Sequence, residues 1–120
     1  MDNTVEEYIS SWNGRLRSSL LDMLILKESA YSTDPVYPYS IAKKLQELWG
    51  ERNAPPLPTV YSVINRMEGK GFIQFSEEIQ GGRVQKKILI QPIGYDLLDE
   101  MNKEIEAYKR DISALQREIL

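Results

Sequence analysis

Polar and cationic side chains gather on one short segment that follows a proline-rich turn and ends at a glycine. Hydroxyl, amide and cationic groups at the start of a helix can hydrogen-bond to phosphates and to base edges in a major groove. The residues of these types are Thr59, Tyr61, Ser62, Asn65, Arg66 and Lys70. The alternative is the solvated face of an ordinary helix, and composition leaves both interpretations open. We expect the Tyr61 ring to lie mainly in the core, because Val60, Ile64 and Met67 share its helix.

A second group of cations lies on the hairpin predicted after this helix. Residues 72–79 and 84–90 have the composition of strands, and the glycine-bearing residues 80–83 form the tip. The first strand has an apolar face that comprises Ile73, Phe75 and Ile79. The cations of the hairpin are Arg83, Lys86 and Lys87. Such cations can enter a minor groove or clamp the DNA backbone. The alternative is cross-strand ion pairing, because the first strand carries Glu77 and Glu78.

The elements that must position these side chains are short helices with strong boundary signals. Apolar residues at helical spacing, proline at helix starts and glycine at helix ends predict helices over 3–12, 16–28, 39–49 and 58–69. Asn13 and Gly14 are expected to break the chain between the first two helices. Helices followed by two strands predict a mostly helical α+β fold, a winged helix-turn-helix with a two-stranded wing.

Pro92 begins a long predicted helix that carries a heptad pattern. Apolar residues repeat at alternating spacings of three and four, which is the pattern of a helix seam. The seam consists of Leu98, Met101, Ile105, Tyr108, Ile112, Leu115 and Ile119. A chain this small has no further element to cover such a stripe. We therefore expect the C-terminal helix to be a dimerisation helix that pairs with a second copy.

Composition excludes several classes of function. The 120 residues predict one domain, and the absence of cysteine and histidine excludes disulfide scaffolds, Cys or His metal sites and histidine general bases. We expect a soluble, cytoplasmic protein without enzymatic activity, cofactor or metal, because no signal segment, phosphate loop or nucleophile elbow is present. The net charge of −3 argues mildly against nucleic acid. Residues 58–91, however, carry five basic and three acidic side chains, whereas both flanking segments are net acidic.

The chain resembles the PadR family of transcriptional regulators over residues 16–101. The resemblance begins with a leucine-rich helix at 16–26 and a tyrosine-bearing helix at 39–45. The most specific motif is a tyrosine in the third helix, then a leucine-type position, a glycine and a hydrophobic pair. These positions are Tyr61, Met67, Gly71, Phe72 and Ile73. The glycine-arginine-lysine stretch of the family wing is similar to Gly82-Arg83 and Lys86-Lys87.

The resemblance implies a dimeric winged-helix repressor of the compact branch, with its third helix in the major groove. We expect residues 1–91 to form the DNA-binding domain, including the helix at 3–12, and residues 92–120 to form the dimerisation helix. The DNA contacts are expected from Thr59, Ser62, Asn65, Arg66, Lys70, Arg83, Lys86 and Lys87. The expected partners are double-stranded DNA with a palindromic operator and a second copy; the sequence identifies no small-molecule effector. The alternative is a winged-helix protein–protein module without DNA binding. The acidic net charge favours this alternative, and such a module should show almost no salt-dependent binding to duplex DNA.

Overall fold

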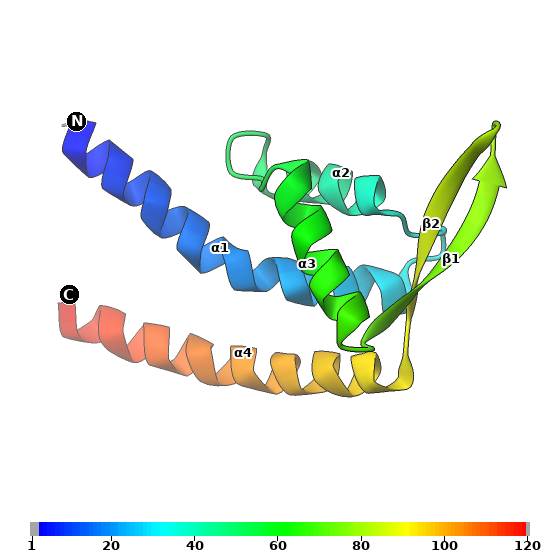
Figure 1. The fold of residues 1–120 in the computed structure, drawn as a ribbon. Helices are drawn as coiled ribbons and strands as arrows, with labels where there is room; N and C mark the ends of the chain where they lie inside the picture. The colour runs from blue at the N-terminus through cyan, green and yellow to red at the C-terminus, as the bar shows by residue number, and fades with distance from the viewer. Residues whose placement is uncertain (1–2, 120) are drawn as a thin grey trace.

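The computed structural model describes residues 3–119, so residues 1, 2 and 120 at the ends of the two expected segments lie outside the description. The elements in chain order are α1 (Asn3–Tyr31), α2 (Pro38–Trp49), α3 (Leu57–Gly69), β1 (Ile73–Gln80), β2 (Arg83–Ile90) and α4 (Pro92–Ile119). The two strands pair antiparallel and form the wing (Figure 1). This arrangement confirms the mostly helical winged helix-turn-helix with a two-stranded wing and a long C-terminal helix.

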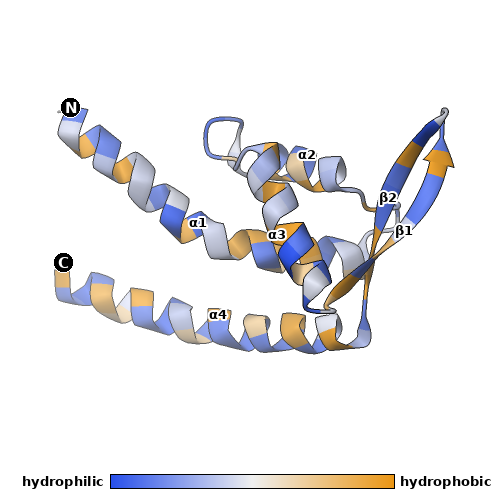
Figure 2. Ribbon diagram, in the orientation of Figure 1, coloured by the Kyte–Doolittle hydropathy of each residue, from blue (hydrophilic) through white to orange (hydrophobic). Residues whose placement is uncertain are grey.

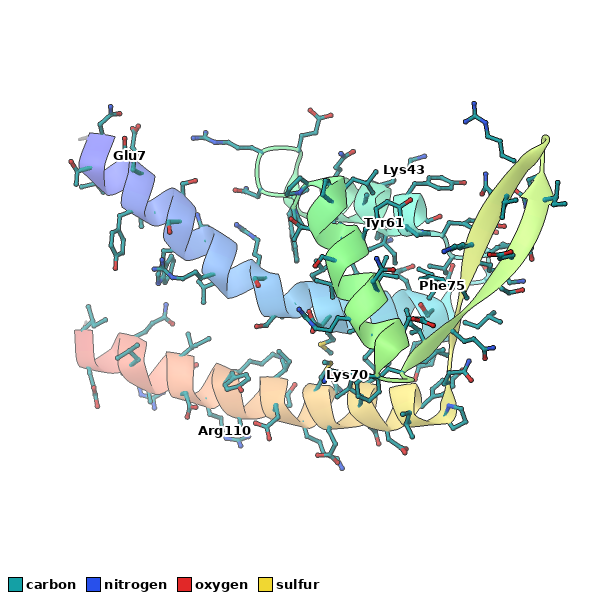
Figure 3. The ribbon with its side chains drawn as sticks, in the orientation of Figure 1. Glu7, Lys43, Tyr61, Lys70, Phe75 and Arg110 are labelled. Atoms are coloured by element: carbon teal, nitrogen blue, oxygen red, sulfur yellow. The ribbon has the colours of Figure 1, made fainter. Side chains whose placement is uncertain are left out.

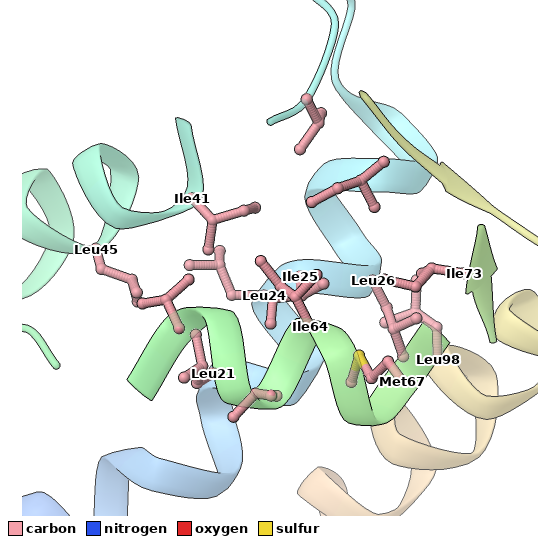
Figure 4. Close-up of a cluster of buried hydrophobic side chains, with 14 residues drawn as sticks. Leu21, Leu24, Ile25, Leu26, Ile41, Leu45, Ile64, Met67, Ile73 and Leu98 are labelled. Carbon is pink, nitrogen blue, oxygen red and sulfur yellow. The ribbon is translucent and has the colours of Figure 1, made fainter. Parts of the chain in front are cut away.

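The core lies where α1 crosses the other elements. Helix α1 contacts α2, α3, α4 and β2. Its second half contributes a buried stripe that packs against apolar residues of every other helix (Figure 4). The side chains that are almost completely buried are Leu21, Ile25, Leu26, Ile41, Leu45, Val60, Ile64 and Ile73. The core therefore fixes α3 and the base of the wing relative to α1.

Local signals set both ends of α3. Pro56 precedes the helix and Pro58 stands in its first turn, where a missing amide hydrogen costs no intrahelical bond. At the other end Gly71 has a φ of 81°, and the amide of Phe72 donates to the Met67 carbonyl at 3.1 Å. This left-handed closure turns the chain directly into β1.

The wing is a tight hairpin that is anchored at its base. Gly81 and Gly82 connect the strands with φ values of 56° and 77°, and positive φ at both positions is what a two-residue type I′ turn requires. Near the base, the Ile88 amide donates to the Val36 carbonyl at 2.7 Å, which ties β2 to the segment before α2. Ile79, placed by the alternation on the apolar face, is 79% exposed because the wing extends beyond the core at that point.

The expected break at Asn13 and Gly14 is wrong, because α1 is one continuous helix of 29 residues. A glycine in a helix interior costs about 1 kcal/mol relative to alanine. The apolar residues Ile9, Trp12, Leu16 and Leu20 nevertheless continue at helical spacing across the glycine. The N-terminal segment 3–12 is therefore the first third of α1 and not a helix of its own.

The outer halves of α1 and α4 extend beyond the winged-helix core in the same direction (Figure 1). Both carry apolar positions in a largely hydrophilic surface (Figure 2). On α1 the exposed apolar residues are Val5, Tyr8, Ile9, Trp12, Leu16 and Leu20. On α4 they include Tyr108, Ile112, Leu115 and Ile119. We call these two sets the α1 stripe and the α4 stripe.

Gly94 in the first turn of α4 is expected to tolerate no side chain. A Cβ there would meet the Phe72 carbonyl oxygen and would lie 2.7 Å from Cγ1 of Ile90. Forcing an extra methyl group into such a contact costs typically about 1–3 kcal/mol. We expect Gly94→Ala to lower the urea midpoint accordingly at fixed protein concentration.

The matched control is Gly69→Ala, at the last residue of α3, where a Cβ would have nothing within 4 Å. This variant should keep or slightly raise the midpoint, because alanine is the better helix former. Equal midpoints for the two variants would contradict the close packing of α4 on the turn before β1.

Candidate nucleic-acid interface

The outward face of α3 includes Tyr61, which the sequence had placed mainly in the core. The buried residues of the helix are Val60, Val63, Ile64 and Met67, which is the i, i+3, i+4, i+7 stripe of a surface helix. Tyr61 is outside that stripe and is 43% exposed. The expectation that its ring lies mainly in the core is therefore wrong. Figure 3 labels Tyr61 in the first half of α3 and Lys70 at its end.

The polar residues of α3 form two rows on either side of its outward face. Tyr61 and Asn65 are four residues apart and make the row nearer the wing. Arg66 lies on the flank that faces α1, where its Nη2 contacts Oδ2 of Asp22 at 3.3 Å. The second row contains Thr59, Arg66 and Lys70 at spacings of seven and four. Ser62 lies between the rows, so Tyr61, Ser62 and Asn65 form one contiguous exposed patch.

A cleft of about 390 Å³ lies between α3 and the wing. Its walls come from the start of α2, from Tyr61 and from β2. Tyr39 stands at this edge with its ring stacked on that of Tyr37, at a centroid distance of 5.8 Å. The wing side of the cleft is formed by Arg83, Val84, Gln85 and Lys86. The structure thus brings two of the three expected wing cations together with α3, and adds two tyrosines to them.

Tyr39 was missed as a candidate because nothing in its spacing distinguishes it from a core aromatic. It is 56% exposed and lies across the cleft from the wing. No signal in the sequence separates Tyr39 from the core residues of α2, because its exposure follows from how that helix packs. Three tyrosines therefore line one cleft, which neither composition nor periodicity indicated.

Lys87 differs from the other wing cations, because it belongs to a network on the outer half of the wing. Its Nζ lies 3.2 Å from Oε1 of Glu78, so the cross-strand alternative holds for this pair. The Tyr37 hydroxyl donates to Oε2 of Glu78 at 3.0 Å and accepts from Nε2 of Gln80 at 3.0 Å. This network connects both strands of the wing to the residue that precedes α2.

Protonation supports the same arrangement. The hydrogen bond from Lys87, and then that from Tyr37, lowers the pKa of Glu78 below its ordinary value of 4.5. Burial, ahead of the neighbouring Glu78, raises the pKa of Tyr37. The carboxylate of Glu78 therefore stays ionised and the phenol of Tyr37 stays protonated at neutral pH.

Lys86 is not part of this network. Its Nζ lies 5.2 Å from the Phe75 ring centre, in a cation–π contact.

The lowered pKa of Glu78 predicts a pH dependence of stability. A carboxylate whose pKa is lower in the folded state contributes stability that is complete above its ordinary pKa, and this contribution is lost as pH falls through the lowered value. The melting temperature of Glu78→Gln should therefore fall less than that of the unaltered protein between pH 5 and pH 3, a window of about two units around the ordinary value. Glu77→Gln, which removes the same charge from the adjacent position, should keep the full dependence. Parallel curves for all three proteins would contradict the role of the network.

Other kinds of site find little support within residues 3–119. In this range no group of acidic side chains is arranged to hold a metal ion. None of the described helices is long and apolar enough to cross a membrane.

The seam expected on the C-terminal helix divides into two parts. Leu98 is 8% exposed within its own protomer, and Met101 packs against the same core. Leu98 therefore packs within its own protomer, because the first turns of α4 complete the winged-helix core, and contact of Met101 with a second copy remains a prediction. Ile105 is partly buried and the seam becomes exposed beyond it, to 74% at Ile119. The sequence pattern also missed the α1 stripe, because the expected break at Gly14 concealed its continuity.

Solved structures with a similar fold include transcriptional regulators of the PadR family. A PadR family transcriptional regulator from Eggerthella lenta superposes with a TM-score of 0.82 at 21% identity, over 95% of this chain and 96% of the other. A PadR family transcription regulator from Clostridium difficile has a TM-score of 0.66 at 25% identity, over 79% and 96%. A PadR-like transcriptional regulator from Bacillus cereus has a TM-score of 0.69 at 20% identity, over 84% and 95%. No protein-family model and no curated protein sequence matches the chain.

Proposed function

We propose that this chain, a PadR-like winged-helix protein, is a transcriptional regulator that binds duplex DNA as a homodimer and represses from a palindromic operator. The observation that carries the proposal is the cleft between α3 and the wing. It places Tyr61 of α3 and the cations Arg83 and Lys86 on one concave surface. The solved regulators with the same fold support a role in transcription. A regulator of this kind acts in the cytoplasm.

Residues 58–70 enter the major groove in this proposal. The groove is about 12 Å wide and admits a single helix, whose outward residues meet the base edges. Ser62 lies between the two rows of the outward face of α3 and Asn65 lies beside it in the row nearer the wing, so their hydroxyl and amide groups can read bases. Tyr61 adds a phenol that can donate to a phosphate. Thr59, Arg66 and Lys70 form the row on the α1 side and contact the backbone there, and Arg66 must exchange Asp22 for phosphate to do so.

The wing contacts the neighbouring backbone or minor groove. Arg83 stands at the end of the hairpin and Lys86 on the cleft side of β2. Neutralising phosphate releases condensed counterions, so each such cation adds affinity that decreases with salt. Lys87 contributes mainly by holding Glu78 and thereby the orientation of the wing. Residues 1–91 remain the proposed DNA-binding domain.

The dimer forms through the stripes on α1 and α4. The outer halves of α1 and α4, which carry these stripes, extend beyond the core at the same end of the protomer (Figure 1). The heptad spacing from Ile105 to Ile119 is suited to packing against another helix. Exposed apolar surface of this extent on a small chain marks an interaction site. Burying it against a second copy gives a two-fold particle with two α3 helices, and hence two half-sites.

One observation favours a second function. The net charge of −3 and the exposed apolar stripes also fit a winged helix that assembles with other proteins and does not bind DNA. Such a module would show almost no salt-dependent affinity for duplex DNA, because it would release no counterions.

Selection of bound sequences from a random duplex pool tests the two functions together. The regulator should enrich an inverted repeat whose half-site centres lie about 34–36 Å apart, or a multiple of this distance. Its affinity should fall steeply as salt rises. If no sequence is enriched and the amount of duplex DNA retained by the protein does not depend on salt, sequence-specific DNA binding is rejected and the protein–protein module is favoured.

A further inference from the structure

A second cavity of about 290 Å³ lies on the other flank of α3, between α1 and the turn that leads into α3. Its walls are largely apolar, and they include the ring of Trp49. The residues on which the argument depends are Arg17, Leu21, Trp49, Pro56, Thr59 and Val63. This cavity shares no lining residue with the cleft that faces the wing.

Arg17 brings a positive charge into this cavity without an anion to balance it. Its guanidinium carbon lies 5.9 Å from the Trp49 ring centre, in a cation–π contact. Its Nη1 is buried and has no hydrogen-bond partner among the described residues. Leaving a buried charged donor unpaired is costly, and an anion beside the same guanidinium offsets part of that cost by balancing its charge. The other arginines nearby differ, because Arg66 contacts Asp22 and Arg15 donates to Ser11 at 3.0 Å.

We propose that this cavity binds a small amphipathic carboxylate. The guanidinium of Arg17, a residue that lines the cavity, holds the carboxylate there, and its planar fork suits that group. Thr59 offers a hydroxyl on the opposite wall. A hydrocarbon body covers Leu21, Val63 and Pro56, because a bare inorganic anion would leave these walls in contact with water. No carboxylate lines the cavity among residues 3–119, so nothing described there competes for Arg17.

The cavity limits the size of its ligand. One water occupies about 30 Å³ of liquid, so 290 Å³ corresponds to a molecule of about ten non-hydrogen atoms. Octanoate has this size, and octanamide matches it atom for atom without the charge. The pair therefore isolates the contribution of the carboxylate.

The position of the cavity connects its occupant to α3. Pro56 and Thr59 belong to the entry and first turn of that helix. A bound acid therefore fixes the end of α3 that the proposed function places in the major groove. The binding site itself does not depend on the proposed function, and only this regulatory consequence rests on it.

Fluorescence of Trp49 measures the binding directly. Trp12→Phe leaves Trp49 as the one tryptophan of the chain, and this background serves for all variants. Octanoate should change the emission saturably and octanamide should bind at least about tenfold more weakly, as expected when a charge-assisted hydrogen bond is lost. Arg17→Met should weaken octanoate by a similar factor. The matched control, Arg15→Met on the same helix, should leave octanoate affinity unchanged.

Two further measurements separate the possible outcomes. Arg17→Lys keeps the charge without the planar fork, so its octanoate affinity should lie between those of the unaltered protein and Arg17→Met. Circular dichroism identifies a variant that has lost its fold. Equal affinity for octanoate and octanamide, or octanoate affinity unaffected by Arg17→Met, overturns the proposal. If the unaltered protein does not bind octanoate and Arg17→Met loses affinity for duplex DNA, the proposal is also overturned and Arg17 is assigned to phosphate contact. If the unaltered protein binds octanoate but does not bind duplex DNA, only the proposed function is rejected.

Discussion

Replacing Ile105 and Ile112 by glutamate should convert the proposed dimer to monomers and abolish tight binding to the proposed palindromic operator. Both residues lie on the seam of α4 beyond the core, and Ile112 is 52% exposed in the protomer. Burial of one such side chain contributes about 1.5–3 kcal/mol, and a symmetric dimer changes four of them. The dimer dissociation constant should therefore rise at least about a thousandfold. Sedimentation velocity measures the change in mass, and operator titration measures the loss of paired half-sites.

The control adds the same charge to the same helix off the seam. Ser113→Glu with Ala114→Glu introduces two carboxylates at exposed positions that the heptad places outside the stripe. This variant should remain dimeric and bind the operator. If the seam variant also stayed dimeric, the interface would have to be placed elsewhere, with the α1 stripe as the next candidate.

Removing the two wing cations that face the cleft should change the salt dependence of DNA binding. Each phosphate contact contributes about −0.9 to the slope of log K against log salt, so Arg83→Ala with Lys86→Ala should reduce its magnitude by about 2. At low salt the affinity should fall about tenfold to a hundredfold. The measurement is operator titration at four or more salt concentrations.

Two controls distinguish wing contact from a general loss of charge. Lys103→Ala with Arg110→Ala removes the same charge from α4, far from the cleft, and should leave the slope nearly unchanged. Ser62→Ala with Asn65→Ala carries no charge change and should reduce discrimination between operator and random duplex at a constant slope. If the slope of log K against log salt is unchanged in Arg83→Ala with Lys86→Ala, the phosphate contacts are assigned to the α1 side of α3, where Arg66 and Lys70 lie.

The order of elements was predictable because each boundary carries a local signal. Pro58 begins α3, Gly71 ends it with a left-handed residue, and two glycines close the wing. Such signals act over four or five residues and need no knowledge of the rest of the chain. The seam of α4 was visible for the same reason, although the sequence did not show that its first two members pack on the core.

The errors arise where tertiary packing decides. Tyr61 adjoins Val60, so the apolar face of α3 could be centred on either side of it, and only contact with α1 selects Val63 instead. Gly14 is a weak helix residue that the neighbouring apolar stripe overrides. The ion pair of Arg66 joins residues 44 positions apart, which no local pattern reveals. The same holds for Lys87, whose partner Glu78 depends on the hairpin register.

Because α1 is one continuous helix, a tilt of its core-bound half moves its outer end. A helix of 29 residues is about 43 Å long, and only its second half packs in the core. Val5 lies about 24 Å along the axis from Leu21, which borders the carboxylate cavity. A tilt of about 5° at Leu21 moves the Val5 end by about 2 Å at this radius. Had the chain hinged at Gly14, that motion would be absorbed. In the proposed dimer, α1 as one continuous helix transmits the motion to the partner protomer and changes the distance between the two α3 helices.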